Sequence, residues 1–154
     1  MKRLNNIIRC ILLASLALAP VVAADIGKMS TQIGATFANT YVWDGKELKT
    51  KIGSTHATTW VWNGRELARK IGATMQNTWV WDGKELKQKA GATMAATWVW
   101  DGKELKTKIG ATMANTWVFQ DNKWRQKIGS TMANTWVVTG SIPVPVMAAV
   151  ILKL

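Results

Sequence analysis

The 154-residue chain carries 20 lysines and arginines against 9 acidic residues, a formal charge of +11, yet 48% of it is hydrophobic and its mean hydropathy is zero. This much apolar surface argues against a chain kept disordered by its charge, and the length suits one domain. A single cysteine and a single histidine exclude a disulfide scaffold and a Cys/His zinc site, whereas ten tryptophans indicate either repetition or a surface that uses them.

Residues 1–24 have the pattern of a cleaved export signal. Lys2, Arg3 and Arg9 form a basic start, residues 11–18 are apolar, and the small residues at 22–24 suit a cleavage site. The apolar run is too short to span a bilayer comfortably. We therefore predict an exported protein, periplasmic or extracellular, with membrane association left open.

A repeat of 19 residues follows, over residues 25–140. One aromatic column recurs at this spacing: Tyr41, Trp60, Trp79, Trp98, Trp117 and Trp136. A second aromatic column lies two residues further on: Trp43, Trp62, Trp81, Trp100 and Phe119. A glycine column has the same period: Gly34, Gly53, Gly72, Gly91, Gly110 and Gly129. Most of the tryptophans therefore come from repetition.

The residue pattern within each repeat predicts a β-hairpin that has one face in the core and one face in solvent. Two-residue turns are expected at Asp44-Gly45, Asn63-Gly64, Asp82-Gly83 and Asp101-Gly102, with a weaker version at Asp121-Asn122. The first of them would pair Trp43 with Lys46, Tyr41 with Leu48, and Phe37 with Ile52. Strand alternation then predicts the core face: Phe37, Tyr41, Trp43, Leu48 and Ile52. It predicts the solvated face as well: Thr40, Val42, Glu47, Lys49 and Lys51.

The two ends of the repeat array predict how the sheet closes. The half-hairpin at 28–33 has no ascending partner, and the strand at 132–138 has no descending one. Pairing these two segments would close a ring and remove the exposed strand edges. The predicted fold class is therefore all-β: a shallow closed barrel of six tandem 19-residue β-hairpins.

Residues 141–154 form an apolar C-terminal segment. A short helix beginning near Pro145 would plug the middle of the ring, where an apolar helix can be buried on all sides. A last β-strand and a membrane-touching tail are the competing interpretations. The segment is too short for a transmembrane span.

The tandem units W-V-W-D-G-K-E-L-K and G-A-T-M-A-N-T-W resemble those of bacterial β-flower proteins, in which hairpin petals form a shallow symmetric barrel. That group is similar in shape to the Tubby C-terminal domain, a barrel of twelve strands around a hydrophobic helix. The resemblance covers Asp25 to about Gly140 and implies the same strand number. Tubby-like domains bind phosphoinositide lipids, but no specific lipid-binding motif of theirs is recognisable in this sequence.

The sequence does not predict an enzyme. His56, the only histidine, occupies a packing column that is otherwise apolar: Phe37, Met75, Met94, Met113 and Met132. The repeated aspartates are better explained by turn geometry than by acid–base chemistry. The sequence has no nucleophile–base pair and no phosphate-binding glycine loop, so we expect no catalytic residue, cofactor or metal site.

The two aromatic columns receive different interpretations. The column of Tyr41 would belong to the core, because it opposes leucines across each hairpin. The second column lies beside the turns, where its tryptophans would oppose basic residues and form a rim. The candidate binding residues are Trp43, Trp62, Trp81, Trp100, Lys46, Arg65, Lys84 and Lys103. The alternative is that these cations cover the indoles as local cation–π pairs with no further role.

Such a rim suits a membrane interface, because tryptophan sits well at headgroup level and Lys and Arg attract anionic lipid. An anionic lipid or envelope polymer is the expected partner; nucleic acid fits the charge, but export makes it a poor physiological partner. The predicted function is a non-catalytic module that docks on an anionic membrane or envelope surface. Carbohydrate- or choline-type cell-wall binding and a purely structural or self-assembling role are the alternatives, and the oligomeric state is left open.

Overall fold

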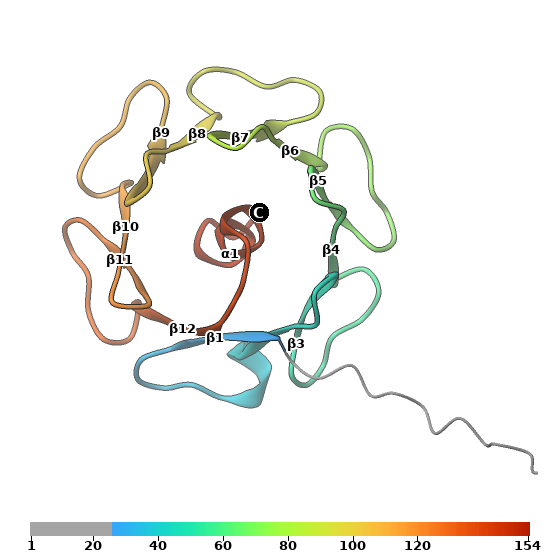
Figure 1. The fold of residues 1–154 in the computed structure, drawn as a ribbon, viewed down its shortest axis with the longest axis vertical. Helices are drawn as coiled ribbons and strands as arrows, with labels where there is room; N and C mark the ends of the chain where they lie inside the picture. Colours follow the sequence, from blue (N-terminus) through green and yellow to red (C-terminus); the bar gives the residue numbers. More distant parts are fainter. Residues whose placement is uncertain (1–25) are drawn as a thin grey trace, which may run out of the picture.

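The computed structural model describes residues 26–154, so the predicted export signal at 1–24 lies outside the described residues. Twelve antiparallel strands close into a barrel around one helix (Figure 1). The strands are β1 (Gly27–Thr31), β2 (Tyr41–Trp43), β3 (Glu47–Thr50), β4 (Trp60–Trp62), β5 (Glu66–Arg69), β6 (Trp79–Trp81), β7 (Glu85–Gln88), β8 (Trp98–Trp100), β9 (Glu104–Thr107), β10 (Trp117–Gln120), β11 (Lys123–Gln126) and β12 (Trp136–Gly140). A 3-10 turn, η1 (Phe37–Asn39), and the helix α1 (Val144–Ile151) complete the fold.

Closure of the barrel by the two ends of the repeat array is confirmed. Strand β1 pairs with β12 along its whole length, from Gly27 opposite Gly140 to Thr31 opposite Trp136. Every other strand pairs with its two neighbours in the sequence, so no described strand has a free edge that invites aggregation.

The predicted description of the barrel is wrong in its details. The structure does not show the shallow shape, and the hairpins do not extend over the 19 residues of a repeat. Each strand has only three to five residues, and nine-residue loops join one hairpin to the next. These petal loops project outward from the ring (Figure 1). They are residues 32–40, 51–59, 70–78, 89–97, 108–116 and 127–135.

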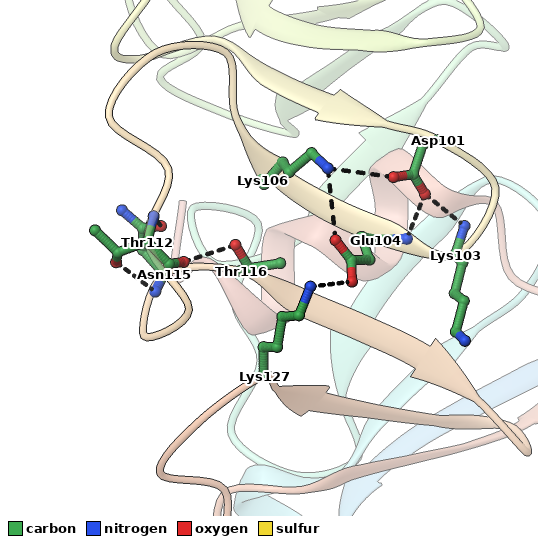
Figure 2. Close-up of polar contacts among 8 residues, drawn as sticks. All are labelled: Asp101, Lys103, Glu104, Lys106, Thr112, Asn115, Thr116 and Lys127. Atoms are coloured by element: carbon green, nitrogen blue, oxygen red, sulfur yellow. Dashed lines mark hydrogen bonds and ion pairs between the residues drawn. The ribbon is translucent and has the colours of Figure 1, made fainter.

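Local hydrogen bonds explain why the chain leaves the sheet at each petal loop. A glycine with positive φ follows the end of the strand, as at Gly53, where φ is 77°. The loop then makes a tight turn, in which the hydroxyl of Thr59 donates to the carbonyl of Thr55 at 2.7 Å. The same bond recurs in the loop of Figure 2, where Thr116 donates to the carbonyl of Thr112 at 2.7 Å. These bonds satisfy backbone groups that the strand ladder would otherwise pair.

The predicted hairpin register is wrong by two residues. Trp43 lies opposite Leu48, and Tyr41 lies opposite Thr50. The reason is the side chain of Asp44, whose Oδ1 accepts from the backbone N–H of Lys46 at 2.9 Å and of Glu47 at 2.7 Å, and so builds a longer turn. Because the shift is by an even number, the inward and outward faces of the strands are preserved.

The fifth hairpin, predicted as the weakest turn, is the one with a two-residue connection. Asp121 and Asn122 have φ values of 52° and 56°, and Gln120 pairs directly with Lys123. Both central residues with positive φ are the mark of a type I′ turn. In the other four hairpins the turn is longer, and the side chain of an Asp or Asn accepts hydrogen bonds from two backbone N–H groups of the turn.

The aspartates in the turns should make the stability of the fold depend on pH in the acidic range. Backbone N–H donors, first those of Glu85 and Glu104, lower the pKa values of Asp82 and Asp101. Stability from a depressed pKa is present above the unfolded value, roughly 4, and is lost as pH falls through the folded one. Asn63 makes the same pair of bonds without titrating. We therefore expect the double variant Asp82→Asn, Asp101→Asn to melt like the parent at neutral pH and to lose less stability below about pH 4.

Thermal melts at several pH values measure this effect. The matched control is Asp82→Ala, Asp101→Ala, which also removes the acceptors and should lower the free energy of unfolding by about 1 kcal/mol per site at neutral pH. An acid dependence that is the same in the asparagine variant and in the parent would refute the assignment.

The core lies between the barrel wall and α1. The helix is buried from Pro145 to Ile151, and a fully buried leucine from each of four hairpins faces it: Leu48, Leu67, Leu86 and Leu105. Trp124 takes the place of leucine in the fifth hairpin and is also fully buried. The C-terminal segment therefore forms the central helix and not a last strand. Among residues 26–154, no helix combines the length and apolar character needed to cross a bilayer.

The burial predicted from the sequence is wrong for four residues. Phe37 and Ile52 lie in petal loops, 58% and 57% exposed, because the strands end before reaching them. Thr40 and Val42, assigned to the solvated face, are buried. The hydroxyl of Thr40 is satisfied by the carbonyl of Thr36 at 2.6 Å, which removes the cost of burying it.

Candidate functional site

The barrel has two chemically different ends. The Asp/Asn turns that close the hairpins all lie at one end, which we call the turn end, and the petal loops lie at the other, the petal end. The helix α1 runs between them. Pro143, before the helix, lines a groove at the turn end with Gly45 and Gly64, and Lys153, after the helix, lines cavities at the petal end.

The predicted tryptophan rim lies at the turn end, but its indoles are packed. Trp43 is 3% exposed, and the other three rim tryptophans are half-buried against the core: Trp62, Trp81 and Trp100. The basic residues lie in the turns and are exposed: Lys46, Arg65, Lys84 and Lys103. The rim therefore presents its cations more than its indoles.

The predicted pairing within the rim is wrong, because the register differs. Lys46 does not oppose Trp43; its carbonyl accepts from the backbone N–H of Trp62 in the next hairpin, at 2.9 Å. The same bond joins Arg65 to Trp81 and Lys84 to Trp100, at 2.8 Å each. Each cation thus lies beside the tryptophan of the following hairpin. Within residues 26–154, the cation–π contacts lie elsewhere: Lys51 over Phe37, and Arg69 over Trp60.

The turn end and the outer wall carry charges of both signs. In Figure 2, the ammonium of Lys127 donates to Glu104 of the preceding hairpin at 2.7 Å, and Lys106 lies 3.4 Å from Asp101. The contact to Lys127 is the first cause of a lowered pKa of Glu104, and the contact to Asp101 is the first cause of a raised pKa of Lys106. The Lys–Glu contact repeats around the wall at Lys70–Glu47, Lys89–Glu66 and Lys108–Glu85. These exposed pairs add little stability, but they neutralise the outer surface locally.

The petal end carries a ring of exposed apolar side chains. Ten of the eleven large hydrophobic residues found exposed in residues 26–154 lie in the petal loops, each between 52% and 60% exposed. We call them the petal ring: Ile33, Phe37, Ile52, Ile71, Met75, Met94, Ile109, Met113, Ile128 and Met132. Every petal loop contributes at least one of them. Apolar side chains grouped in this way mark an interaction site more often than single exposed ones do.

The charged side chains within the petal loops are all basic. No petal loop contains Asp or Glu, and five of the six begin with lysine: Lys51, Lys70, Lys89, Lys108 and Lys127. Lys153, exposed after the end of α1, adds a further cation in the middle of this face. The acidic partners of the petal lysines belong to the strands and not to the loops. Four of the petal lysines are thus paired with strand glutamates, and Lys51 and Lys153 are the lysines of this end that form no ion pair within residues 26–154. The petal end therefore combines apolar tips with a smaller excess of positive charge.

Two cavities of about 500 Å³ each open at the petal end, one on either side of Lys153. One is walled by Trp98, Trp117 and Trp136. The other is lined by Tyr41, Trp60 and Arg69, whose guanidinium lies 3.8 Å from the centre of the Trp60 ring. Partial burial lowers the pKa of Arg69. Within residues 26–154, no three His, Cys, Asp or Glu side chains are grouped to hold a metal.

The sequence did not predict the petal ring, because its methionine column was assigned to packing by the strand-pairing argument. A signal for it is present in the printed sequence: the nine residues before each first-column aromatic never include an acid. Comparison of the chain with protein-family models, with curated proteins and with solved structures found no match. The architecture, a closed antiparallel barrel built from tandem hairpins, fits a β-flower-like repeat barrel.

Proposed function

We propose that this chain is an exported, non-catalytic module that docks on an anionic membrane through its petal end. The observation that carries the proposal is the petal ring: apolar side chains on six loops, at an end of the barrel whose loops contain lysines and no acids. Long-range attraction from the net charge would bring the protein to an anionic surface. Burial of the petal ring among the lipid headgroups would then hold it there.

The shape of the petal ring favours a lipid surface as the partner. The six loops that carry it are distributed around the whole ring (Figure 1), so its side chains do not line a single groove, and a broad, deformable surface suits them better than a compact partner. A second copy of the same face is a poorer partner, because it would bring Lys51 and Lys153 of both copies together, and neither forms an ion pair within residues 26–154. Charge complementarity therefore points to an anionic bilayer.

The resemblance to known folds belongs to the same proposal. We assign the chain to the β-flower group, and twelve strands around a buried apolar helix support the similarity in shape to the Tubby C-terminal domain. Lipid binding is a property of Tubby-like domains; for this chain it rests on the petal ring alone. The turn-end rim of cations is the second candidate contact, because four exposed basic residues gather there: Lys46, Arg65, Lys84 and Lys103.

Flotation of the purified chain with vesicles tests the function. We expect binding to vesicles of phosphatidylcholine with phosphatidylglycerol to exceed binding to phosphatidylcholine alone by at least about tenfold, and to weaken as salt is raised. Because apolar burial does not respond to screening, part of the binding should survive in high salt. Equal binding to both vesicles, or none to either, would refute the proposal.

A further inference from the structure

The cavity walled by tryptophans is produced by a mismatch of symmetry. The barrel wall repeats around the ring, but a single helix fills its middle, so the repeats cannot all be packed alike. Trp60, Trp79 and Trp117 of the first aromatic column are buried, whereas Trp98 and Trp136 are only half-buried. These two half-buried indoles and Trp117 line the same cavity of about 500 Å³, which we call the indole cavity.

The volume of the indole cavity lies within the range of ligand sites, and aromatic residues line it. Cavities that bind small molecules enclose roughly 300–1,000 Å³ and combine aromatic walls with a few polar groups. Three indoles from successive repeats form the walls here, and Ile151 and Leu152 close the side toward the helix. The cavity is open to solvent, so a flat apolar ligand surface that displaces water from the indoles would gain the free energy of apolar burial.

The polar groups of the indole cavity suit hydroxyls and a negative charge. The amide nitrogen of Gln126 donates to the carbonyl of Ala114 at 2.9 Å, which holds the side chain in place and leaves its Oε1 as an acceptor for a ligand. Lys153 has no carboxylate within 4.0 Å among residues 26–154, and no acidic residue lines the cavity. An anion would therefore meet an unpaired ammonium group.

We propose that the indole cavity binds a saccharide ring that carries an anionic substituent, such as a sugar phosphate or a uronic acid. The C–H face of the ring would stack on the indoles, its hydroxyls would reach Gln126, and its anionic group would pair with Lys153. A choline-type cation is disfavoured, because Lys153 would repel it. This site adds a specific ligand to the proposed docking function, and it does not depend on the petal ring.

The indole N–H signals of the ten tryptophans provide a direct readout by NMR, with Trp98, Trp117 and Trp136 assigned through single Trp→Phe variants. In a titration with glucose 6-phosphate, without vesicles, we expect these three signals to move and those of Trp62 and Trp81 at the turn end to stay. Glucose itself should bind about tenfold more weakly, and choline should cause no shift. Absence of any shift with either sugar would overturn the proposal.

Charge-neutralising variants test the role of Lys153. Lys153→Gln should remove the preference for the phosphate over the neutral sugar, whereas Lys28→Gln, at an exposed lysine of β1 that belongs to neither candidate contact, should keep it. An unchanged preference in Lys153→Gln would overturn the assignment. If glucose 6-phosphate lowers flotation with vesicles that contain an anionic glycolipid but not with phosphatidylglycerol vesicles, the sugar of a lipid headgroup is the natural source. Unchanged flotation with both kinds of vesicle points to a soluble saccharide. Because the NMR titration contains no lipid, failure of the membrane proposal would not affect it.

Discussion

Replacement of Trp124 by alanine is expected to lower the free energy of unfolding by about 3–5 kcal/mol, the largest effect of a single substitution in this barrel. Trp124 is fully buried, its ring centre lies 5.0 Å from that of Phe119 and 5.3 Å from that of Trp100, and its Nε1 donates to the sulfur of Met147 at 3.2 Å. It thereby joins the barrel wall to α1. Chemical denaturation followed by far-UV circular dichroism measures the loss.

The repeat itself provides a matched control for this substitution. Trp124→Leu restores the residue that the other four hairpins use, at Leu48, Leu67, Leu86 and Leu105. We expect a loss smaller than that of Trp124→Ala but still above about 1 kcal/mol, because leucine leaves part of the volume beside Met147 empty. If the Trp124→Leu variant had the same free energy of unfolding as the parent, the larger side chain would contribute nothing to packing against the helix, and our account of the core would be wrong.

Removal of the apolar tips from the petal ring is expected to weaken vesicle binding by about a hundredfold. The variant replaces four exposed methionines by glutamine: Met75, Met94, Met113 and Met132. Glutamine keeps a similar length and charge but resists transfer to an apolar environment. The melting temperature should stay close to that of the parent, since exposed side chains contribute little to the core. Flotation with phosphatidylglycerol-containing vesicles measures the partition coefficient.

The matched variant changes four residues at the other end of the barrel, replacing each of Lys46, Arg65, Lys84 and Lys103 by glutamine. If the petal end faces the membrane, these positions lie beyond strong electrostatic reach, and binding should fall by less than about threefold at physiological salt. A large loss in this turn-end variant together with full binding by the methionine variant would transfer the contact to the rim predicted from the sequence.

Much of the barrel is readable from the sequence, because the repeat makes each local signal appear several times. The period of 19, the turn residues and the unpaired half-hairpins at the two ends predict a closed barrel, and the apolar run from about Pro145 predicts its central helix. The register was mispredicted because Asp44 acts through its side chain and not through a two-residue turn. A pattern of residue types does not reveal which of these two geometries an Asp-Gly pair adopts.

The candidate site was less predictable, because it depends on where the strands end. Extending the hairpin as far as Phe37 and Ile52 placed them in the core, whereas both lie outside the strands. Glycines with positive φ, Gly34 and Gly53, and the threonine hydrogen bonds shape the loops that carry these two residues outward. The repeat pattern could not predict the indole cavity, because the cavity forms where a single helix packs against a wall built from repeats. The sequence predicted an apolar and basic contact surface beside the turns, whereas the contact that we propose lies at the petal end; the vesicle experiments distinguish the two.

Attachment of an environment-sensitive fluorophore at each end of the barrel tests the petal-end docking most directly. In a chain whose only cysteine, Cys10, is replaced by serine, the dye is coupled to a new cysteine at Met94→Cys in one variant and at Arg65→Cys in the other. On anionic vesicles we predict a blue shift of emission at Met94→Cys and unchanged emission at Arg65→Cys. A blue shift at Arg65→Cys with no change at Met94→Cys would contradict the account.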